Sequence, residues 1–298
     1  MNKEEPKEKI EEKETSDDVE TVEVVEPISE EEVLKNVRKP EPSELDKWSP
    51  KTSLGKIVKN KEITDIDQIL DSGLKILEKE IVELLLPNLE NDLLLIGQSK
   101  GKFGGGQRRI FKQTQKKTRE GNKPRFTTMA VVGNKDGYIG LGTGKSKETV
   151  PSREKAIRKA KLNIIKIRRG CGSWECLCKN PHSIPYSVEG KEGSVIIKLI
   201  PAPKGTGLVI ESECAKLLDL VGIKDIWARS FGHTKTKMNV IKACFKALKK
   251  LGETKIGHQD IEKLGIIEGK STPKSETDDD FIEEIKNGES KEPTKEKK

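Results

Sequence analysis

The chain has 298 residues, of which 32% are hydrophobic and 36% are charged, and it carries a formal net charge of +7. This composition excludes one hydrophobic core across the whole length, so we expect disordered ends around a smaller fold. The charge is about −9 over residues 1–50 and about +16 over residues 91–170, which favours a polyanionic partner, and nucleic acid before others.

Residues 1–49 are a mixture of glutamate, lysine, valine and proline with no sustained period, and we predict a disordered acidic arm. The arm either shields the basic region before its partner binds or is a solvated tail. It lacks the apolar stretch of a signal peptide, and no apolar run in the chain reaches the length of a membrane helix. These features predict a cytoplasmic protein.

Residues 50–92 carry apolar side chains at helical spacing and predict three short helices, the last closed by Pro87. We expect this helical segment to dock on the domains that follow or on a neighbouring protein. The apolar positions of the three helices are, in order, Leu54, Ile57 and Val58, then Ile66, Ile69 and Leu70, then Ile76, Leu77, Ile81, Leu84 and Leu85.

Residues 98–118 are a run of glycine, lysine, arginine and glutamine in which Phe103 and Phe111 are interleaved. A loop of this composition can bind phosphates and stack on unpaired bases. The paired Arg108 and Arg109 beside flexible glycines favour RNA contact over a merely flexible basic linker.

The stretch from Arg125 to Arg169 predicts the centre of the fold. A strand to Val132, a turn at residues 133–137 and a second strand from Tyr138 read as a β-hairpin. Pro151 then opens a helix with one apolar and one basic face. We expect the apolar face to pack on the hairpin and the basic face to lie along a phosphate backbone. The apolar positions are Ile157, Ala160, Ile164 and Ile167, and the opposite positions are Lys155, Lys159, Asn163 and Lys166.

The connector, residues 170–186, contains Cys171, Cys176, Cys178 and His182, the ligand types of a structural zinc site. Their spacing matches neither a standard finger nor a ribbon. The single residue between Cys176 and Cys178 is awkward, because neighbouring side chains of an extended chain point to opposite sides. A zinc site and a cluster of reduced, partly buried structural thiols both stay open. The odd total of five cysteines argues against a disulfide framework.

Residues 187–252 predict a second α+β layer domain with the element order β, β, α, β, α. Cys214 and Cys244 fall on the apolar faces of its two helices, so we interpret both as core residues rather than ligands. Gly222 is a suitable end for the first of these helices. Residues 253–298 are predicted to be a mostly disordered tail.

No arrangement of side chains in the sequence supports catalysis, and we predict that the chain is not an enzyme. The run from Gly140 to Ser146 is similar to a phosphate-binding loop, but the glycine required five positions before Gly144 is replaced by Ile139. The glycines more simply let the strand approach a partner backbone closely, with Lys145 neutralising a phosphate.

Several motifs resemble the universal small-subunit ribosomal protein S5 family in its archaeal form. In chain order they are VVGNKDGYIGLGTGKSKE, AIRKAKLNIIKIRRGCGSWECLCKNPHSIP, GSVIIKLIPAPKGTGL, LVGIKDIWARSFG and NVIKACFKALKKL, and the resemblance covers about Trp48 to Leu251. It implies an α+β fold, with a double-stranded-RNA-binding-like N-terminal domain at residues 93–169 and a two-layer α+β C-terminal domain at residues 187–252. The acidic termini and the GKFGGGQRR insertion depart from the family pattern, so the resemblance implies nothing about them.

The resemblance also implies a function. A member of this family is a structural constituent of the small ribosomal subunit that binds small-subunit rRNA and neighbouring ribosomal proteins. It lies near the path along which mRNA enters and supports decoding accuracy. Carried over by position, the loop from Arg119 to Arg125 is expected to reach into rRNA, and Gly140, Gly142 and Gly144 to lie against it.

The candidate RNA-binding residues combine the basic pattern with this resemblance. They are Lys102, Arg108, Arg109, Lys112, Lys116, Lys117, Arg119, Lys123, Arg125, Gly140, Gly142, Gly144, Lys145, Lys147, Arg153, Lys155, Lys159, Arg168 and Arg169. We expect no membrane or small-molecule partner, and the one candidate cofactor is a structural zinc ion.

Two alternatives stay open at the level of the sequence. A stand-alone double-stranded-RNA-binding protein in RNA processing or regulation would use the same basic residues outside the ribosome. A zinc-dependent enzyme at the Cys/His cluster would need an open coordination position and a general base, and the sequence shows neither.

Overall fold

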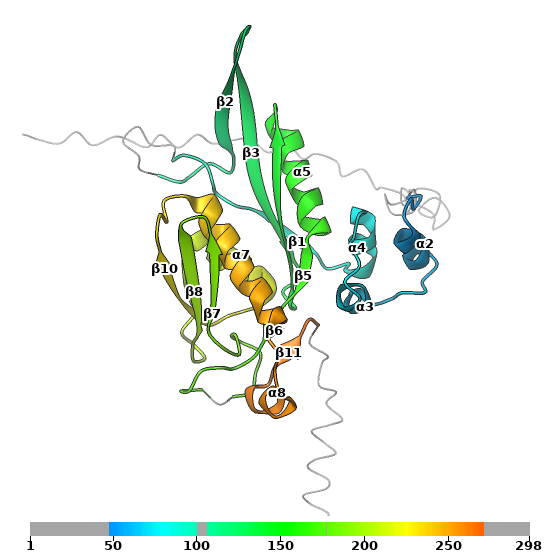
Figure 1. Ribbon diagram of the computed structural model, residues 1–298, viewed down its shortest axis with the longest axis vertical. Coiled ribbons are helices and arrows are strands. Elements are labelled where there is room, and N and C mark those ends of the chain that lie inside the picture. Colours follow the sequence, from blue (N-terminus) through cyan, green and yellow to red (C-terminus); the bar gives the residue numbers. More distant parts are fainter. Residues whose placement is uncertain (1–47, 100–105, 177, 271–298) are drawn as a thin grey trace, which may run out of the picture. The chain divides into compact units, whose positions relative to one another are not determined.

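The computed structural model describes residues 48–99, 106–176 and 178–270 (Figure 1). The predicted disordered arm up to residue 47, Lys102 with Phe103, and the predicted tail beyond residue 270 lie outside the described residues. The described chain forms a five-stranded, a four-stranded and a two-stranded sheet with helices packed on them, so the predicted α+β class is confirmed. None of its helices is both long and apolar enough to cross a membrane.

The first sheet contains the predicted hairpin. Its strands are β1 (Glu90–Leu93), β2 (Lys112–Thr118), β3 (Gly121–Gly133), β4 (Tyr138–Ser146) and β5 (Ile164–Lys166). The order is β1-β3-β4-β5, and all pairs are antiparallel. Strand β2 pairs with residues 121–127 of β3, and β1 pairs with residues 130–133 of the same strand. In the turn between β3 and β4 the Asn134 side chain accepts hydrogen bonds from the backbone N–H groups of Asp136 and Tyr138. The turn predicted from the sequence is therefore confirmed.

Helix α5 (Thr149–Leu162) covers one face of this sheet at close range. Three buried glycines of β4 lie under three small residues of the helix, and a Cβ on any of them would come within 2.1 Å of a helix backbone oxygen. Alternate strand residues repeat about every 6.8 Å and helix residues four apart about every 6 Å, so the two rows stay in step. The facing pairs are Gly140 with Ala160, Gly142 with Ala156, and Gly144 with Ser152.

The helix therefore packs on the hairpin as predicted, but through other residues. Ile164 begins strand β5 and Ile167 follows that strand, so neither belongs to the helix. The helix stops because Asn163 leaves the helical conformation and donates a side-chain hydrogen bond to the Leu141 carbonyl oxygen at 3.1 Å. The periodicity rule counted large apolar residues and passed over the small ones that make the contact.

The helical segment before the sheet forms the three predicted helices, α2 (Ser53–Lys59), α3 (Ile66–Asp71) and α4 (Lys79–Leu85). Ile76 and Leu77 lie outside the third helix, which starts later than predicted. A hydrophobic cluster joins these helices to Tyr138 and Ile164 of the first sheet. Salt bridges of 2.6 Å from Lys161 to Glu83 and from Lys166 to Asp71 reinforce the contact. The segment therefore packs on the first sheet, one of the two docking surfaces expected from the sequence.

The second sheet has the order β7-β8-β10-β9, with β9 parallel to β10. Its elements are β7 (Val188–Glu192), β8 (Val195–Pro201), β9 (Leu208–Val209), α6 (Ser212–Val221), β10 (Ile226–Phe231) and α7 (Lys237–Glu253). The predicted order β, β, α, β, α is confirmed for the elements from β8 onwards. Strand β7, which comes before them, was not predicted because its sequence VEGKE is mostly polar. Gly222 ends α6 with φ +88°, as predicted.

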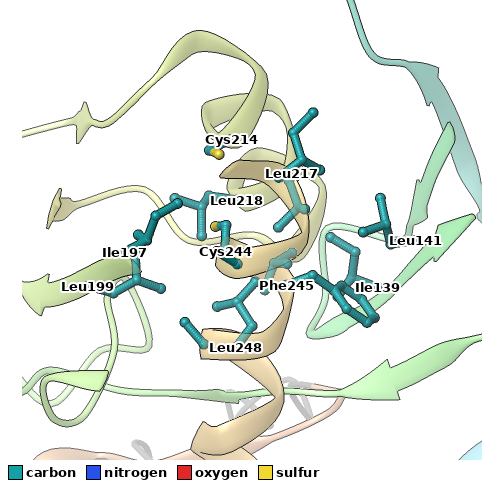
Figure 2. Close-up of a cluster of buried hydrophobic side chains, with 14 of the residues drawn as sticks. Ile139, Leu141, Ile197, Leu199, Cys214, Leu217, Leu218, Cys244, Phe245 and Leu248 are labelled. Carbon is teal, nitrogen blue, oxygen red and sulfur yellow. The ribbon is translucent and has the colours of Figure 1, made fainter. Parts of the chain in front are cut away.

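The largest core cluster joins the two sheets. Ile139 and Leu141 of β4 pack towards Leu217 of α6 and Phe245 of α7 (Figure 2). Cys214 and Cys244 are fully buried in this core, which confirms the prediction for both cysteines. The two sheets therefore share one hydrophobic core within the described residues.

The segment after α7 corrects the predicted tail. Helix α8 (His258–Leu264) and strand β11 (Ile267–Glu268) follow, and β11 pairs with β6 (Arg168–Arg169) in the two-stranded sheet. Gly265 and Gly269, both with positive φ, turn the chain back towards the connector, and Ile266 is buried. Residues 253–270 are therefore folded. Sequence composition did not predict this because the stretch is short and rich in charged residues.

Candidate nucleic-acid interface and metal centre

Strands β2 and β3 extend beyond the rest of the first sheet as a two-stranded ribbon (Figure 1). Strand β4 ends at Ser146, opposite Phe126, whereas β2 continues to pair with β3 as far as Thr118 and Gly121. The paired residues beyond Phe126 make a ribbon about 20 Å long. Residues 112–118 were predicted as a loop because they lack apolar alternation; the structure corrects this to a strand.

Strand register places five of the predicted cations on one face of the ribbon and of the sheet at its base. Residues paired across antiparallel strands share a face, and positions two apart along a strand return to it. Thr127 pairs with both Lys112 and Lys145, which fixes these two on one face. Lys116, Lys123 and Arg125 occupy the same face further along the ribbon.

This cationic face, defined as Lys112, Lys116, Lys123, Arg125 and Lys145, is exposed at every member. The remaining ribbon positions of that face are threonines and Gly121, so no carboxylate lies among its strand residues. Lys123 forms an ion pair with Glu120 at the ribbon tip. The other four members make no ion pair within the described part of the chain.

A groove of about 560 Å³ continues the cationic face at the base of the ribbon. Arg108, Arg109 and Lys112 line it from one side. Lys235 and Lys237 line it from the other, at the start of α7. The sequence reasoning missed these two lysines because FGHTKTK has no partner pattern of its own, and only the fold brings it to residues 108–112. Lys237 also pairs with Glu211.

Phe111 has a different role from the predicted base stacking. It is half-buried, and its ring packs edge-to-face on Phe126 with centroids 5.4 Å apart. This contact lies where β4 stops pairing with β3 and the two-stranded ribbon starts. Phe111 therefore anchors the ribbon to the sheet.

The basic residues of α5 lie on the opposite side of the sheet. Lys155 and Lys159 are exposed, as is Arg158, which the sequence reasoning left out, and Arg153 is half-buried. Helix α5 covers the sheet face that carries the glycines, whereas Lys145 belongs to the other face. The predicted cations thus form two separate surfaces. Lys117 lies on the reverse of the ribbon and so outside the cationic face. Arg119 is exposed at the ribbon tip, and Lys147 is exposed just after β4 ends.

Four predicted RNA-binding residues are buried in the fold, which corrects the prediction for them. Gly140, Gly142 and Gly144 face the backbone of α5. Arg169 is 5% exposed, forms a 2.7 Å ion pair with Asp136 and donates to the Gly269 carbonyl oxygen.

Arg168 has its donors occupied inside the chain as well. It pairs with Glu268 of β11 and donates to the carbonyl oxygens of Leu251 and Thr254 at the end of α7. The two arginines therefore join the folded C-terminal segment to the rest of the chain rather than extending the basic surface.

The connector brings its four predicted ligands together. The sulfur atoms of Cys171, Cys176 and Cys178 and a ring nitrogen of His182 all lie within 4.8 Å of one another. The predicted obstacle at the Cys176–Cys178 spacing is thereby removed, although Leu177 between them lies outside the described residues. The cluster can hold a metal ion.

The local fold accounts for this geometry. Lys179 takes a left-handed conformation with φ +55°, which turns the chain after Cys178 so that His182 returns to the sulfurs. Burial raises the pKa of the Cys171 thiol to about 11. A hydrogen bond from the Lys204 backbone, followed by those from Cys178, lowers the pKa of Cys176 to about 6. One thiol of the cluster is thus already inclined towards the thiolate form that binds metals.

His182 is oriented by a carboxylate. Its Nδ1 lies 2.8 Å from Asp225 Oδ2, and both side chains are buried. Asp225 Oδ1 accepts hydrogen bonds from the backbone N–H groups of Gly205 and Gly207. The His182 Nε2 atom faces the Cys176 sulfur at 3.8 Å. Sequence reasoning missed Asp225 because it lies 43 residues from His182.

Two family models match the chain. The model described as ribosomal protein S5, N-terminal domain, matches residues 110–168, and the model described as ribosomal protein S5, C-terminal domain, matches residues 190–262. The first spans the ribbon and α5, and the second spans the second sheet and α7.

Curated relatives match most of the chain. Small ribosomal subunit protein uS5 of Nanoarchaeum equitans is 52% identical over 225 residues, which are 76% of this chain and 96% of that protein. The protein of the same name from Methanocaldococcus jannaschii is 48% identical over 76% of this chain and 97% of its own. That of Thermofilum pendens is 47% identical over 68% of this chain and 93% of its own.

Proposed function

The chain belongs to the ribosomal protein S5 family, and we propose that it binds small-subunit rRNA through the cationic face of the β2–β3 ribbon and the groove at its base. As a family member it is a structural constituent of the small ribosomal subunit, located with the ribosome in the cytoplasm, and its partners are rRNA and other ribosomal proteins. The role of the family is structural rather than catalytic. The proposal names the part of the chain that contacts rRNA.

The observation that carries this proposal is the strand register. Five exposed cations on one face of the ribbon and its base, with no acidic strand residue among them, can each neutralise a phosphate and release a counterion. A two-stranded ribbon without its own core is marginal in water, and contact with RNA would stabilise it. The groove extends the same surface with Arg108, Arg109 and Lys235.

Contacts with neighbouring proteins fit a different surface. In the helical segment the exposed large apolar side chains include Leu74, Leu77 and Leu84, which are 51%, 68% and 40% exposed. We propose that these leucines contact a neighbouring small-subunit protein. The family resemblance further supports a position near the path along which mRNA enters and an effect on decoding accuracy.

The cofactor proposed for this chain is a structural zinc ion at the connector cluster. We also propose, from the family role, that the chain itself is not an enzyme.

The test compares two triple variants with equal loss of charge. Removal of Lys116, Lys123 and Arg125 by alanine substitution is expected to weaken binding of the full chain to small-subunit rRNA about 30-fold and to reduce the salt slope of log Kd by about 3. The matched control, K155A/R158A/K159A on α5, is expected to cost less than about 5-fold. Filter binding across a salt series measures both, and equal losses in the two variants would contradict the proposal.

A second measurement places the protein in the cell. Sedimentation of lysate at raised salt is expected to show the protein with small-subunit rRNA. The K116A/K123A/R125A variant is expected to move partly to the top of the gradient. A salt-resistant free pool of the unaltered protein would instead favour the stand-alone RNA binder.

A further inference from the structure

We propose that Cys171, Cys176, Cys178 and His182 bind one Zn²⁺ ion as a closed structural site, with Asp225 as the residue that positions His182. This inference goes beyond rRNA binding, because no residue of the cluster lines the cationic face or the groove. It is the one group of three or more potential metal ligands found among the residues that the structure describes.

The separations suit a tetrahedral ion. Zinc–sulfur bonds of about 2.3 Å and a zinc–nitrogen bond of about 2.1 Å place two sulfurs of a tetrahedral site about 3.8 Å apart and a sulfur and a nitrogen about 3.6 Å apart. The Cys176 sulfur and His182 Nε2 already lie at 3.8 Å, and no ligand pair is separated by more than 4.8 Å. An inward movement of about 1 Å by the more distant side chains closes the site, and three thiolates with one imidazole are ligands that zinc prefers.

Asp225 determines which ring nitrogen is available. Because its carboxylate holds Nδ1, the tautomer with Nδ1–H leaves the Nε2 lone pair directed at the sulfurs. The backbone N–H groups of Lys224 and Asp225 also donate to the His182 carbonyl oxygen, at 2.9 and 3.1 Å. The histidine is thus held by both its side chain and its main chain before any ion binds, as in other carboxylate–histidine–zinc arrangements.

The site has four protein ligands and therefore no open position for a substrate. Cys171 is 2% exposed and His182 is 8% exposed, whereas Cys176 and Cys178 are half-buried, so the ion would be partly shielded from water. These features distinguish a structural site from a catalytic one, which keeps a coordination position for water. The zinc-dependent enzyme considered from the sequence is not favoured by this geometry.

The ion would fasten a connector that has little core of its own. Cys171 donates through its backbone to Leu264 of α8, and Gly170 exchanges two backbone hydrogen bonds with Ser183. A Cβ on Gly265 would lie 2.0 Å from the Lys179 oxygen, so the turn after α8 packs tightly on the cysteine loop. One ion would join residues that lead out of the first sheet to the turn before β10 and to α8.

The first experiment measures metal content in the full chain. Protein produced with zinc in the medium and passed over a desalting column with a weak chelator is expected to retain about one zinc per chain by elemental analysis. Cobalt substituted for zinc is expected to give the intense d–d and thiolate charge-transfer absorption of a tetrahedral cysteine-rich site. Less than about 0.1 zinc per folded chain after saturation with zinc, together with no such cobalt spectrum, would overturn the proposal in favour of reduced structural thiols.

Variants then assign the ligands. C176S/C178S is expected to lose the ion, whereas C214A, which removes a core thiol, keeps it. H182C is expected to retain the ion with a cobalt spectrum shifted towards four sulfurs. This outcome would show that a substitution at position 182 leaves the connector folded and that residue 182 is a ligand. D225N is expected to bind zinc roughly 10- to 100-fold more weakly in a chelator competition while reaching the same stoichiometry. Retention of zinc by C176S/C178S, or an unchanged affinity in D225N, would contradict the assigned ligands or the positioning role.

The experiment is independent of rRNA binding. Zinc-free protein that keeps its salt-dependent affinity for small-subunit rRNA would leave the proposed function intact and remove only the metal site. A zinc-loaded protein without that affinity would do the reverse.

Discussion

Near the end of β4 the two faces of the first sheet differ in what covers them. Gly144 lies beneath α5, close to the helix backbone, whereas its neighbour Lys145 is exposed on the cationic face. The covered face is further fixed by a buried hydrogen bond from the Thr128 hydroxyl to the Ser152 carbonyl oxygen. The alternation of strand side chains places Gly140, Gly142 and Gly144 against α5. Leu141, Thr143 and Lys145 lie on the other face, where Leu141 enters the shared core and Lys145 is exposed.

The largest effect is expected from a substitution on the covered face. In Gly142→Val the new side chain would meet the Ala156 oxygen, 2.1 Å from the Cβ position, and the Ala160 nitrogen at 2.3 Å. Because both are backbone atoms of a packed helix, the free energy of unfolding is expected to fall by about 3 kcal/mol or more. Urea denaturation of the full chain measures this change.

The control for that variant lies on the opposite face of the same strand. Thr143→Val next to Gly142 is expected to change the unfolding free energy by less than about 1 kcal/mol. Folded Gly142→Val protein is expected to bind rRNA within about twofold of the unaltered chain, because the glycine is buried. A large loss of affinity with normal stability would restore the original prediction that these glycines contact RNA.

The sequence was informative wherever the determining contacts are local. The three short helices and the β3–β4 hairpin follow from apolar spacing and from turn residues such as Asn134, and the structure confirms them. Strand β2 was misread because its KQTQKKT sequence has no apolar alternation and gains its order by pairing with β3. Gly140, Gly142 and Gly144 were misread because a close approach to a helix and a close approach to RNA both require a residue without a Cβ.

Other misreadings depend on distant partners. Arg169 belongs to the same basic run as the helix cations, but Asp136, 33 residues earlier, takes it into the interior. Lys235 enters the groove only because α7 starts beside residues 108–112. The four connector ligands could be named from their residue types, whereas their mutual approach and the role of Asp225 required the fold.

The second prediction addresses the groove at the base of the exposed face. Reversal of two charges by R108E/R109E is expected to weaken rRNA binding of the full chain about 100-fold, which corresponds to about 2.7 kcal/mol. The reversed charges would meet phosphates beside Lys112 and Lys235. Filter binding at several salt concentrations measures the change.

A milder variant separates charge from shape at the same place. R108A/R109A is expected to lose about 10-fold, with thermal stability close to that of the unaltered protein, because Arg109 is exposed and the paired backbone is retained. Unchanged binding of R108E/R109E across the salt series would remove the groove from the RNA-binding surface and leave the ribbon alone.

The smallest effect gives the sharpest comparison, because it uses two adjacent lysines of the ribbon. Lys116 pairs with Lys123 on the cationic face, whereas Lys117 pairs with Asn122 on the reverse. Both are exposed and have the same intrinsic charge, so composition cannot distinguish them. Lys116→Ala is expected to weaken rRNA binding about threefold and to lower the salt slope by about 1.

Lys117→Ala is expected to change the affinity by less than about 1.5-fold with no measurable change in the salt slope. The reason is that Lys117 lies on the reverse face, away from the phosphates that the cationic face would contact. Equal effects of the two substitutions would mean that RNA surrounds the ribbon on both faces. In that case total charge, rather than strand register, would govern its binding, and the basic residues of α5 would be expected to contribute as strongly as those of the cationic face.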